Sequence, residues 1–160
     1  MAAGNTYVAI AEQTLGTAAA SVTFSSISGA YTDLVLVVTG TMTGGPDSVV
    51  LQFNGDTGSN YSATILSGNG SSASSLRVST NNGGLIESAQ SNSIIHIMNY
   101  ANSTTYKTIL GRGNATASLI RQSVGLWRNT SAITSILVKQ DSSGNFLTGS
   151  TFSLYGIAAA

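Results

Sequence analysis

Short β-rich runs recur along the whole chain, separated by clusters of Gly, Asn, Ser and Asp, and they leave few folds open to it. The runs are rich in Val, Ile, Thr, Tyr and Phe, whereas the clusters between them are typical of turns. No long stretch has the 3.6-residue period of an amphipathic helix. The clearest runs are "TYVAIAEQ", "DLVLVVTGTM", "SVVLQF", "YSATIL", "SIIHIMNY", "YKTILG", "AITSILVKQ" and "TFSLYGIA". The pattern predicts about nine or ten strands and an antiparallel all-β fold.

The number of predicted strands favours two packed sheets over a small five-stranded barrel. We therefore expect an antiparallel β-sandwich of jelly-roll-like type, and a chain of 160 residues suits a single domain. Residues 1–20 are expected to form an N-terminal segment, either an arm or an edge strand, and residues 21–160 to form the sandwich domain. The apolar run from Leu34 to Val38 fits a central strand that is buried on both faces or covered by a neighbouring subunit.

Local patterns also predict which strands are neighbours. "SIIHIMNY" and "YKTILG" are expected to pair across the linker "ANSTT". "SVVLQF" and "YSATIL" are expected to pair across "FNGDTGSNYS". "NNGG", from Asn81 to Gly84, is expected to be a turn because Asn and Gly tolerate left-handed backbone conformations.

The composition argues against several classes of partner. Charged residues make up only 8% of the chain, compared with about 25% in an ordinary soluble domain. The formal net charge is +0, so we expect no binding to nucleic acid or to an anionic membrane. Cysteine is absent, which excludes disulfides and thiolate metal sites. A weakly charged surface repels other copies little, which favours a surface covered by partners or by copies of the same chain.

The chain offers little for catalysis. His96 is its one histidine, and on a strand it shares a face with Ile94, Met98 and Tyr100 while the isoleucines between them point the other way. We expect a half-buried, hydrogen-bonded structural histidine, because no G-x-S-x-G elbow supplies a nucleophile. The chain is therefore not expected to be an enzyme. A hydrolase that depends on His96 is the alternative.

The loop "FNGDTGSNYS", from Phe53 to Ser62, has the residue types of a binding loop. Calcium accepts carboxylate and carbonyl oxygens, but Asp56 is the one acid here, where a strong calcium loop supplies several. An Asp/Gly turn at the rim of the sandwich explains the same residues without a metal. We expect no metal and no cofactor, and leave calcium or a glycan at the Asp56 loop as alternatives.

Trp127 is the one tryptophan of the chain and lies in the polar context "VGLWRNTS". Such a residue can stack on a sugar ring or anchor an interface, although a place in the core or at a protein interface is favoured. Arg112, Arg121 and Arg128 are the nearest approach to a basic stripe with an interleaved aromatic residue. With no net positive charge, they do not predict nucleic-acid binding.

Several blocks of the chain together resemble a group of tailed-bacteriophage virion proteins found in marine and cyanobacterial phages. The blocks are "SVTFSSISGAYTDLVLV", "LQFNGDTGSNYS", "YANSTTYKT", "GLWRNTSAITSI" and "GSTFSLYGI", which span the chain from about Ser21 to Ile157. The resemblance implies a virion component with a β-sandwich fold: a capsid decoration protein, a head fibre or a tail-fibre module. It implies no catalytic residues.

Within that group, a short chain without a long shaft fits a capsid decoration (cement) protein. We expect a homotrimer that binds the outer surface of the major capsid protein shell and stabilises it, with Tyr7, Val8, Ile10 and Trp127 as partner-binding residues. The alternative is a fibre-associated adhesive module that binds host surface glycans through an exposed Tyr61, Trp127 and the Asp56 loop. The start of the chain lacks the features of a signal peptide, so we expect synthesis in the host bacterial cytoplasm and a final place on the capsid surface.

Overall fold

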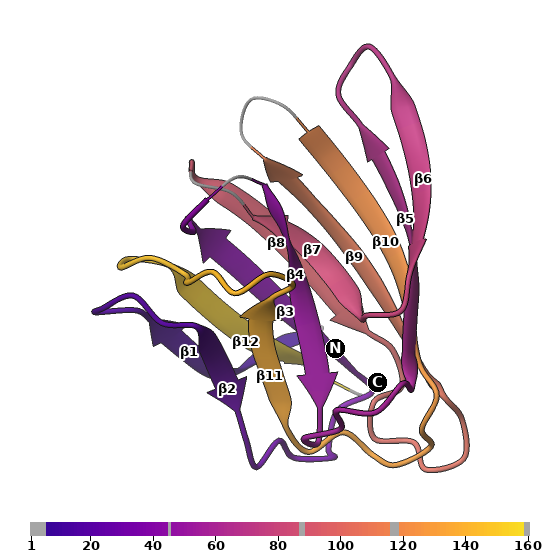
Figure 1. Ribbon diagram of the computed structural model, residues 1–160. Helices are drawn as coiled ribbons and strands as arrows, with labels where there is room; N and C mark the ends of the chain where they lie inside the picture. The colour runs from indigo at the N-terminus through magenta and orange to yellow at the C-terminus, as the bar shows by residue number, and fades with distance from the viewer. Residues whose placement is uncertain (1–5, 45, 87–88, 116–118, 159–160) are drawn as a thin grey trace.

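Two antiparallel β-sheets pack face to face (Figure 1). The computed structural model describes residues 6–44, 46–86, 89–115 and 119–158. The strands in this part of the chain are β1 (Tyr7–Thr14), β2 (Ser21–Phe24), β3 (Asp33–Gly40), β4 (Asp47–Phe53), β5 (Tyr61–Gly68), β6 (Ala73–Val78), β7 (Asn82–Ile86), β8 (Ser91–Ile97), β9 (Lys107–Ala115), β10 (Leu119–Trp127), β11 (Ile136–Gln140) and β12 (Thr151–Ile157). These residues contain no helix.

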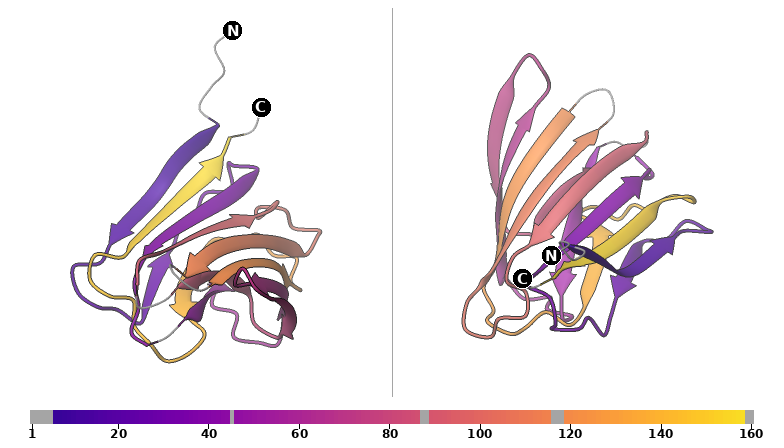
Figure 2. Two further views of the ribbon diagram at one scale, coloured as in Figure 1. Left: turned by 90° about the horizontal axis from the view of Figure 1, so that it is seen from above. Right: turned by 180° about the vertical axis from the view of Figure 1, so that it is seen from behind.

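The larger sheet has eight strands in the order β1-β12-β3-β8-β9-β10-β5-β6, and the smaller has four in the order β2-β11-β4-β7. Figure 1 shows the small sheet lying over one face of the large sheet. The view from behind in Figure 2 shows the opposite face of the large sheet, which no described strand covers. The predicted fold is confirmed: the protein is an all-β, antiparallel, jelly-roll-like sandwich of one domain.

Side chains that alternate along the strands fill the space between the sheets, as a period of two requires. On β3, Leu34, Leu36 and Val38 point into this core and are buried. Val35 points to the opposite face and is buried as well. The prediction that Leu34 to Val38 is a central strand buried on both faces therefore holds for Val35. β3 pairs with β12 on one side and β8 on the other.

Glycines let the two sheets approach closely at β7. A side chain at Gly111 of β9 would collide with the backbone carbonyl of Gly83, and one at Gly84 would lie 2.6 Å from the hydroxyl of Ser93. The prediction that Asn81 to Gly84 is a turn is therefore wrong. The glycines stand here because a strand backbone lies directly on the opposite sheet.

Of the two predicted strand pairs, one is confirmed and one is wrong. β8 and β9 pair antiparallel, as expected. β4 pairs with β11 and β7 in the small sheet, whereas β5 pairs with β10 and β6 in the large sheet. The loop between β4 and β5 therefore crosses from one sheet to the other. Two strands that follow each other in sequence have the same local pattern whether they form a hairpin or cross between sheets. The packing of the sheets decides between the two arrangements.

The N-terminal segment supplies an edge of the large sheet. Within it, β1 pairs with β12 from Tyr7 opposite Ile157 to Thr14 opposite Thr151, with an irregularity between Ala9 and Ala11. Residues 1–5 lie outside the described part of the chain. At the opposite edge, the β5–β6 hairpin extends beyond the small sheet (Figure 1), and β6 is largely exposed.

Candidate functional site

The uncovered face of the large sheet, which we call the outer face, carries rows of side chains set by strand register. In one row, Ile94, Arg112, Gln122 and Leu66 lie opposite one another across β8, β9, β10 and β5. Large apolar side chains are exposed on this face: Tyr7, Leu66, Ile94, Leu110, Ile120 and Val124. Ile120 is 67% exposed and Leu66 is 55% exposed. A contiguous apolar face of this kind marks an interaction site more often than a solvated surface.

A groove crosses this face. Its larger part has a volume of about 560 Å³ and runs over β8, β9, β10 and β5. A smaller hollow of about 180 Å³ shares Ile94, Arg112 and Gln122 with it and reaches Tyr7 near β1. We call the two together the outer groove. Aliphatic side chains line its larger part, whereas Arg112 and Gln122 supply polar groups to both parts.

The exposed guanidinium of Arg112 has no hydrogen bond or ion pair with any other described residue. The other two arginines considered above are engaged. Arg121 Nη1 donates to Ser48 Oγ at 2.8 Å, and burial lowers the pKa of Arg121 although nearby carboxylates oppose this. Arg128 donates to Ser62 Oγ at 2.8 Å. The three arginines therefore do not work as one basic stripe, and Arg112 alone offers a free cation inside the groove.

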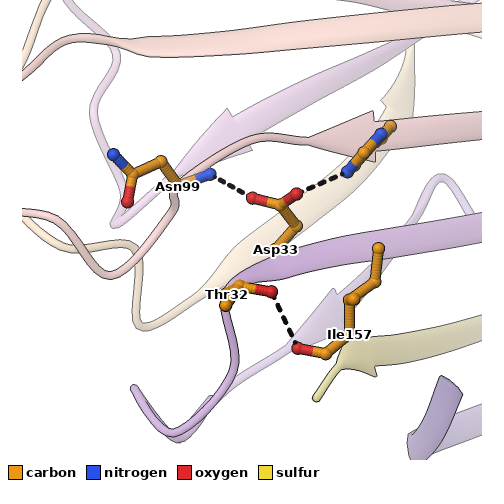
Figure 3. A network of polar contacts seen from close by, with 5 residues as sticks. Thr32, Asp33, Asn99 and Ile157 are labelled. Carbon is orange, nitrogen blue, oxygen red and sulfur yellow. Dashed lines mark hydrogen bonds and ion pairs between the residues drawn. The ribbon is translucent and has the colours of Figure 1, made fainter. Parts of the chain in front are cut away.

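His96 lies on the outer face and contacts Asp33. Its Nε2 lies 3.0 Å from Oδ2 of Asp33, and the backbone N–H of Asn99 donates to Oδ1 of Asp33 at 2.6 Å (Figure 3). The predicted half-buried, hydrogen-bonded histidine is confirmed. The expected face is wrong at Tyr100, which is buried in the core because the chain turns at Asn99, where φ is +51°.

The loop between β4 and β5 is held by its own polar groups. Asn54 and Gly55 have φ of 51° and 70°, and the N–H of Asp56 donates to Phe53 O at 2.8 Å, as in a type I′ turn. The carboxylate of Asp56 accepts hydrogen bonds from Asn60 Nδ2 at 2.9 Å and from the N–H of Gly58 at 2.9 Å. The turn interpretation thus accounts for the loop by contacts within the chain.

Trp127 also contacts this loop, through its buried side chain. Its side chain has 0% exposure, and its indole Nε1 donates to Oδ2 of Asp56 at 2.7 Å. The prediction that Trp127 binds a partner is therefore wrong for this structure, and its place is the core. Tyr61, at 7% exposure, stacks on Trp127 with ring centroids 6.4 Å apart. An exposed pair for sugar stacking is thus also wrong. Burial raises the pKa of Tyr61 to about 12.

The remaining predicted partner-binding residues lie on β1. Tyr7 is 58% exposed, meets Tyr155 edge-on with centroids 6.4 Å apart, and borders the outer groove. Val8 is half-buried, and Ile10 packs against the core. The structure therefore brings Tyr7 to the groove and turns Ile10 away from it.

The groove residues Arg112, Gln122 and Ile120 were missed as a site by sequence reasoning. A signal for them existed: "LIRQSVGLW" has apolar residues in both phases of a strand, which predicts two contacting faces where a half-solvated strand shows one. Among the described residues, no group of three or more His, Asp or Glu side chains is placed to hold a metal ion. No helix in the same residues is long and apolar enough to cross a membrane.

No protein-family model matches the chain, and no curated protein matches it. Among solved structures, the alginate lyase Aly36B is 9% identical, with 91% of this chain and 76% of that chain covered and a TM-score of 0.36. A double mutant of the same lyase in complex with an alginate tetrasaccharide is 8% identical, with 74% and 70% covered and a TM-score of 0.28. Similarity at this level carries no conclusion about activity.

Proposed function

We propose that the protein is a virion structural protein, a capsid decoration protein that binds the outer surface of the major capsid protein shell and stabilises it. One observation carries this proposal: the outer face exposes several large apolar side chains on a sheet face that no described strand covers. Many copies that each bury apolar area across the joints of a shell would stabilise it mechanically, and the avidity of an oligomer would raise occupancy. The resemblance of the chain to phage virion proteins supports a place on the virion.

The contacts of the ionisable groups are consistent with a structural role. His96 is held by Asp33, and Asp56 is held by Trp127 and Asn60. Each of these groups fixes a strand end or a loop. In a catalytic site, such groups would be arranged around a position where a substrate can react.

The experiment is to count this protein in purified phage particles and then to remove it. Quantitative mass spectrometry should find it in numbers comparable to the capsomers, and particles stripped of it should lose DNA at a lower temperature. Re-addition of the purified protein should restore the heat resistance. A few copies per particle, located on the tail, would contradict a decoration role.

A fibre-associated adhesive module is the second candidate, and the outer groove is the observation that favours it. A groove of about 560 Å³ with a free guanidinium and an amide suits a small polar ligand with an apolar side. The buried Trp127 and Tyr61 take no part in this version. Saturable binding on a glycan array that is lost on Gln122→Ala and on Arg112→Ala would support it, whereas an array without binding would contradict it.

A further inference from the structure

We propose that the outer groove of one copy receives the β1 edge of a neighbouring copy, with Glu12 of that copy placed against Arg112. The inference deepens the proposed function. It rests on that function for the expectation that three copies form a closed ring. The contact itself is inferred from the exposed residues of the outer face. A surface contact between copies fits a chain whose charged residues are only 8% of the total, since little long-range repulsion keeps copies apart.

The free guanidinium decides what the groove accepts. Arg112 lies between Ile94 and Gln122 in one row of the outer face. An apolar occupant alone would strip water from this cation and leave it unpaired, which is costly. An occupant that brings a carboxylate between apolar groups turns that cost into a charge-assisted contact, for which arginine is well suited. The groove therefore selects an acidic segment with apolar neighbours.

Glu12 meets this requirement. It is exposed, and it has no hydrogen bond or ion pair with other described residues. Three other carboxylates are engaged: Asp33 with His96, Asp47 with Ser142, and Asp56 with Trp127. Asp141 follows β11 of the small sheet and lies close to the charges of Asp47, Lys139 and Arg121. Glu12 also follows the short apolar stretch "YVAIA". β1 is an edge strand with one unpaired side, and such an edge readily joins another chain.

Glu12 and Arg112 do not pair within one copy, since no ion pair joins them. They lie in the same row of the outer face, which runs from Glu12 through Ser153, Val37 and Ile94 to Arg112, with three strands between them. Both charges are therefore available to a neighbouring copy.

The positions of the two patches favour a head-to-tail contact. A symmetric pair centred on the groove would set Arg112 of one copy beside Arg112 of the other, which like charges oppose. A two-fold axis through Val37 would pair Glu12 with Arg112 but leave Ile120 and Leu66 uncovered. A contact between different patches closes into a ring when the rotation allows it, and the homotrimer expected of a capsid decoration protein would be such a ring.

The test is the mass of the purified full chain in solution, by sedimentation equilibrium across a wide concentration range, with three reversed-charge variants. Glu12→Arg and Arg112→Glu should each weaken association roughly tenfold to hundredfold. The double variant restores the opposite charges and should recover most of the association. Lys139→Glu changes the charge by the same amount as Arg112→Glu, lies on the small sheet, and should leave association unchanged.

Thermal unfolding of each variant checks that the fold is intact. Because Glu12 and Arg112 are both exposed, the fold should tolerate substitutions at these positions. A wild-type mass of three copies with recovery in the double variant is the expected result. A monomer at every concentration, a mass of two copies, or association without recovery would overturn the proposal. These results are independent of whether the protein is found on virions, so the proposed function can fail while the contact stands.

Discussion

The indole Nε1 of Trp127 donates a hydrogen bond of 2.7 Å to Oδ2 of Asp56, 71 positions earlier in the chain. This bond ties the loop that crosses between the sheets to the end of β10. The same carboxylate also accepts from Asn60 and Gly58. The loop that has the composition of a binding site is therefore a clamp over the largest buried side chain of the core.

Replacing Asp56 with alanine should destabilise the protein, because the buried indole N–H loses its acceptor. A buried donor left without a partner costs about 1–3 kcal/mol, and urea unfolding should show a loss of this size. Ser142→Ala, which removes an exposed hydroxyl bonded to Asp47, is the control and should cost less. An Asp56→Ala protein as stable as the wild type would mean that the clamp does not contribute to the fold.

Acidification should test the same contact. The hydrogen bonds from Trp127, and then from Asn60 and Gly58, hold the pKa of Asp56 below its ordinary value of 3.8. Its stabilisation is therefore fully present above the unfolded-state pKa and is lost as the pH falls through the lower folded-state pKa. Asp56→Asn should lose less stability than the wild type between about pH 5 and pH 2. Parallel pH profiles for the two proteins would contradict the assignment.

Trp127 should be inaccessible to solvent in the native protein. It is the one tryptophan and has no exposed surface, so its fluorescence should resist quenching by iodide until the protein is unfolded in urea. The emission maximum should then move to longer wavelength. Strong quenching of the native protein would restore the hypothesis that Trp127 is a surface anchor.

Tyr61 should make stability fall at alkaline pH. Burial raises its pKa from 10.0 to about 12, and the negative charge of Asp56 adds to this. Stability from the neutral phenol is fully present below pH 10 and is lost as the pH rises through about 12. Tyr61→Phe should flatten this part of the profile, at a cost of about 1 kcal/mol for its hydrogen bonds. The exposed Tyr106 changed to Phe is the control, which should leave the alkaline loss in place.

Gly111→Ala should be among the most damaging single-methyl substitutions, because the added carbon would collide with the backbone of Gly83. Overpacking of a core costs about 1–3 kcal/mol and sometimes more, and a backbone neighbour cannot move aside as a side chain can. Gly16→Ala places the same methyl where nothing lies within 4 Å and should change stability little. Equal thermal midpoints for the two variants would contradict the close approach of the sheets.

The strands and their buried faces were largely predictable, because a period of two is a local signal. On β8, Ile95 and Ile97 are buried while Ile94 is exposed, as alternation alone predicts. The predicted alternation was extended too far along the chain, to Tyr100. There the chain leaves the strand through Asn99, and a residue with positive φ interrupts the alternation.

The remaining errors concern contacts between distant parts of the chain. "NNGG" has the composition of a turn, and it becomes strand β7 because Gly111 lies across from Gly83. Trp127 has polar neighbours in sequence, yet the acceptor that its burial requires comes from Asp56. The outer groove depends on the register of four strands, and register is not visible in any single strand.

A cryo-EM map of the intact phage particle is the decisive measurement for the proposal that this protein coats a capsid through contacts with protein partners. Density for the sandwich is expected at repeated positions over the whole shell, with the outer groove covered by protein. Density confined to the tail, or an outer face open to solvent at every copy, would contradict it.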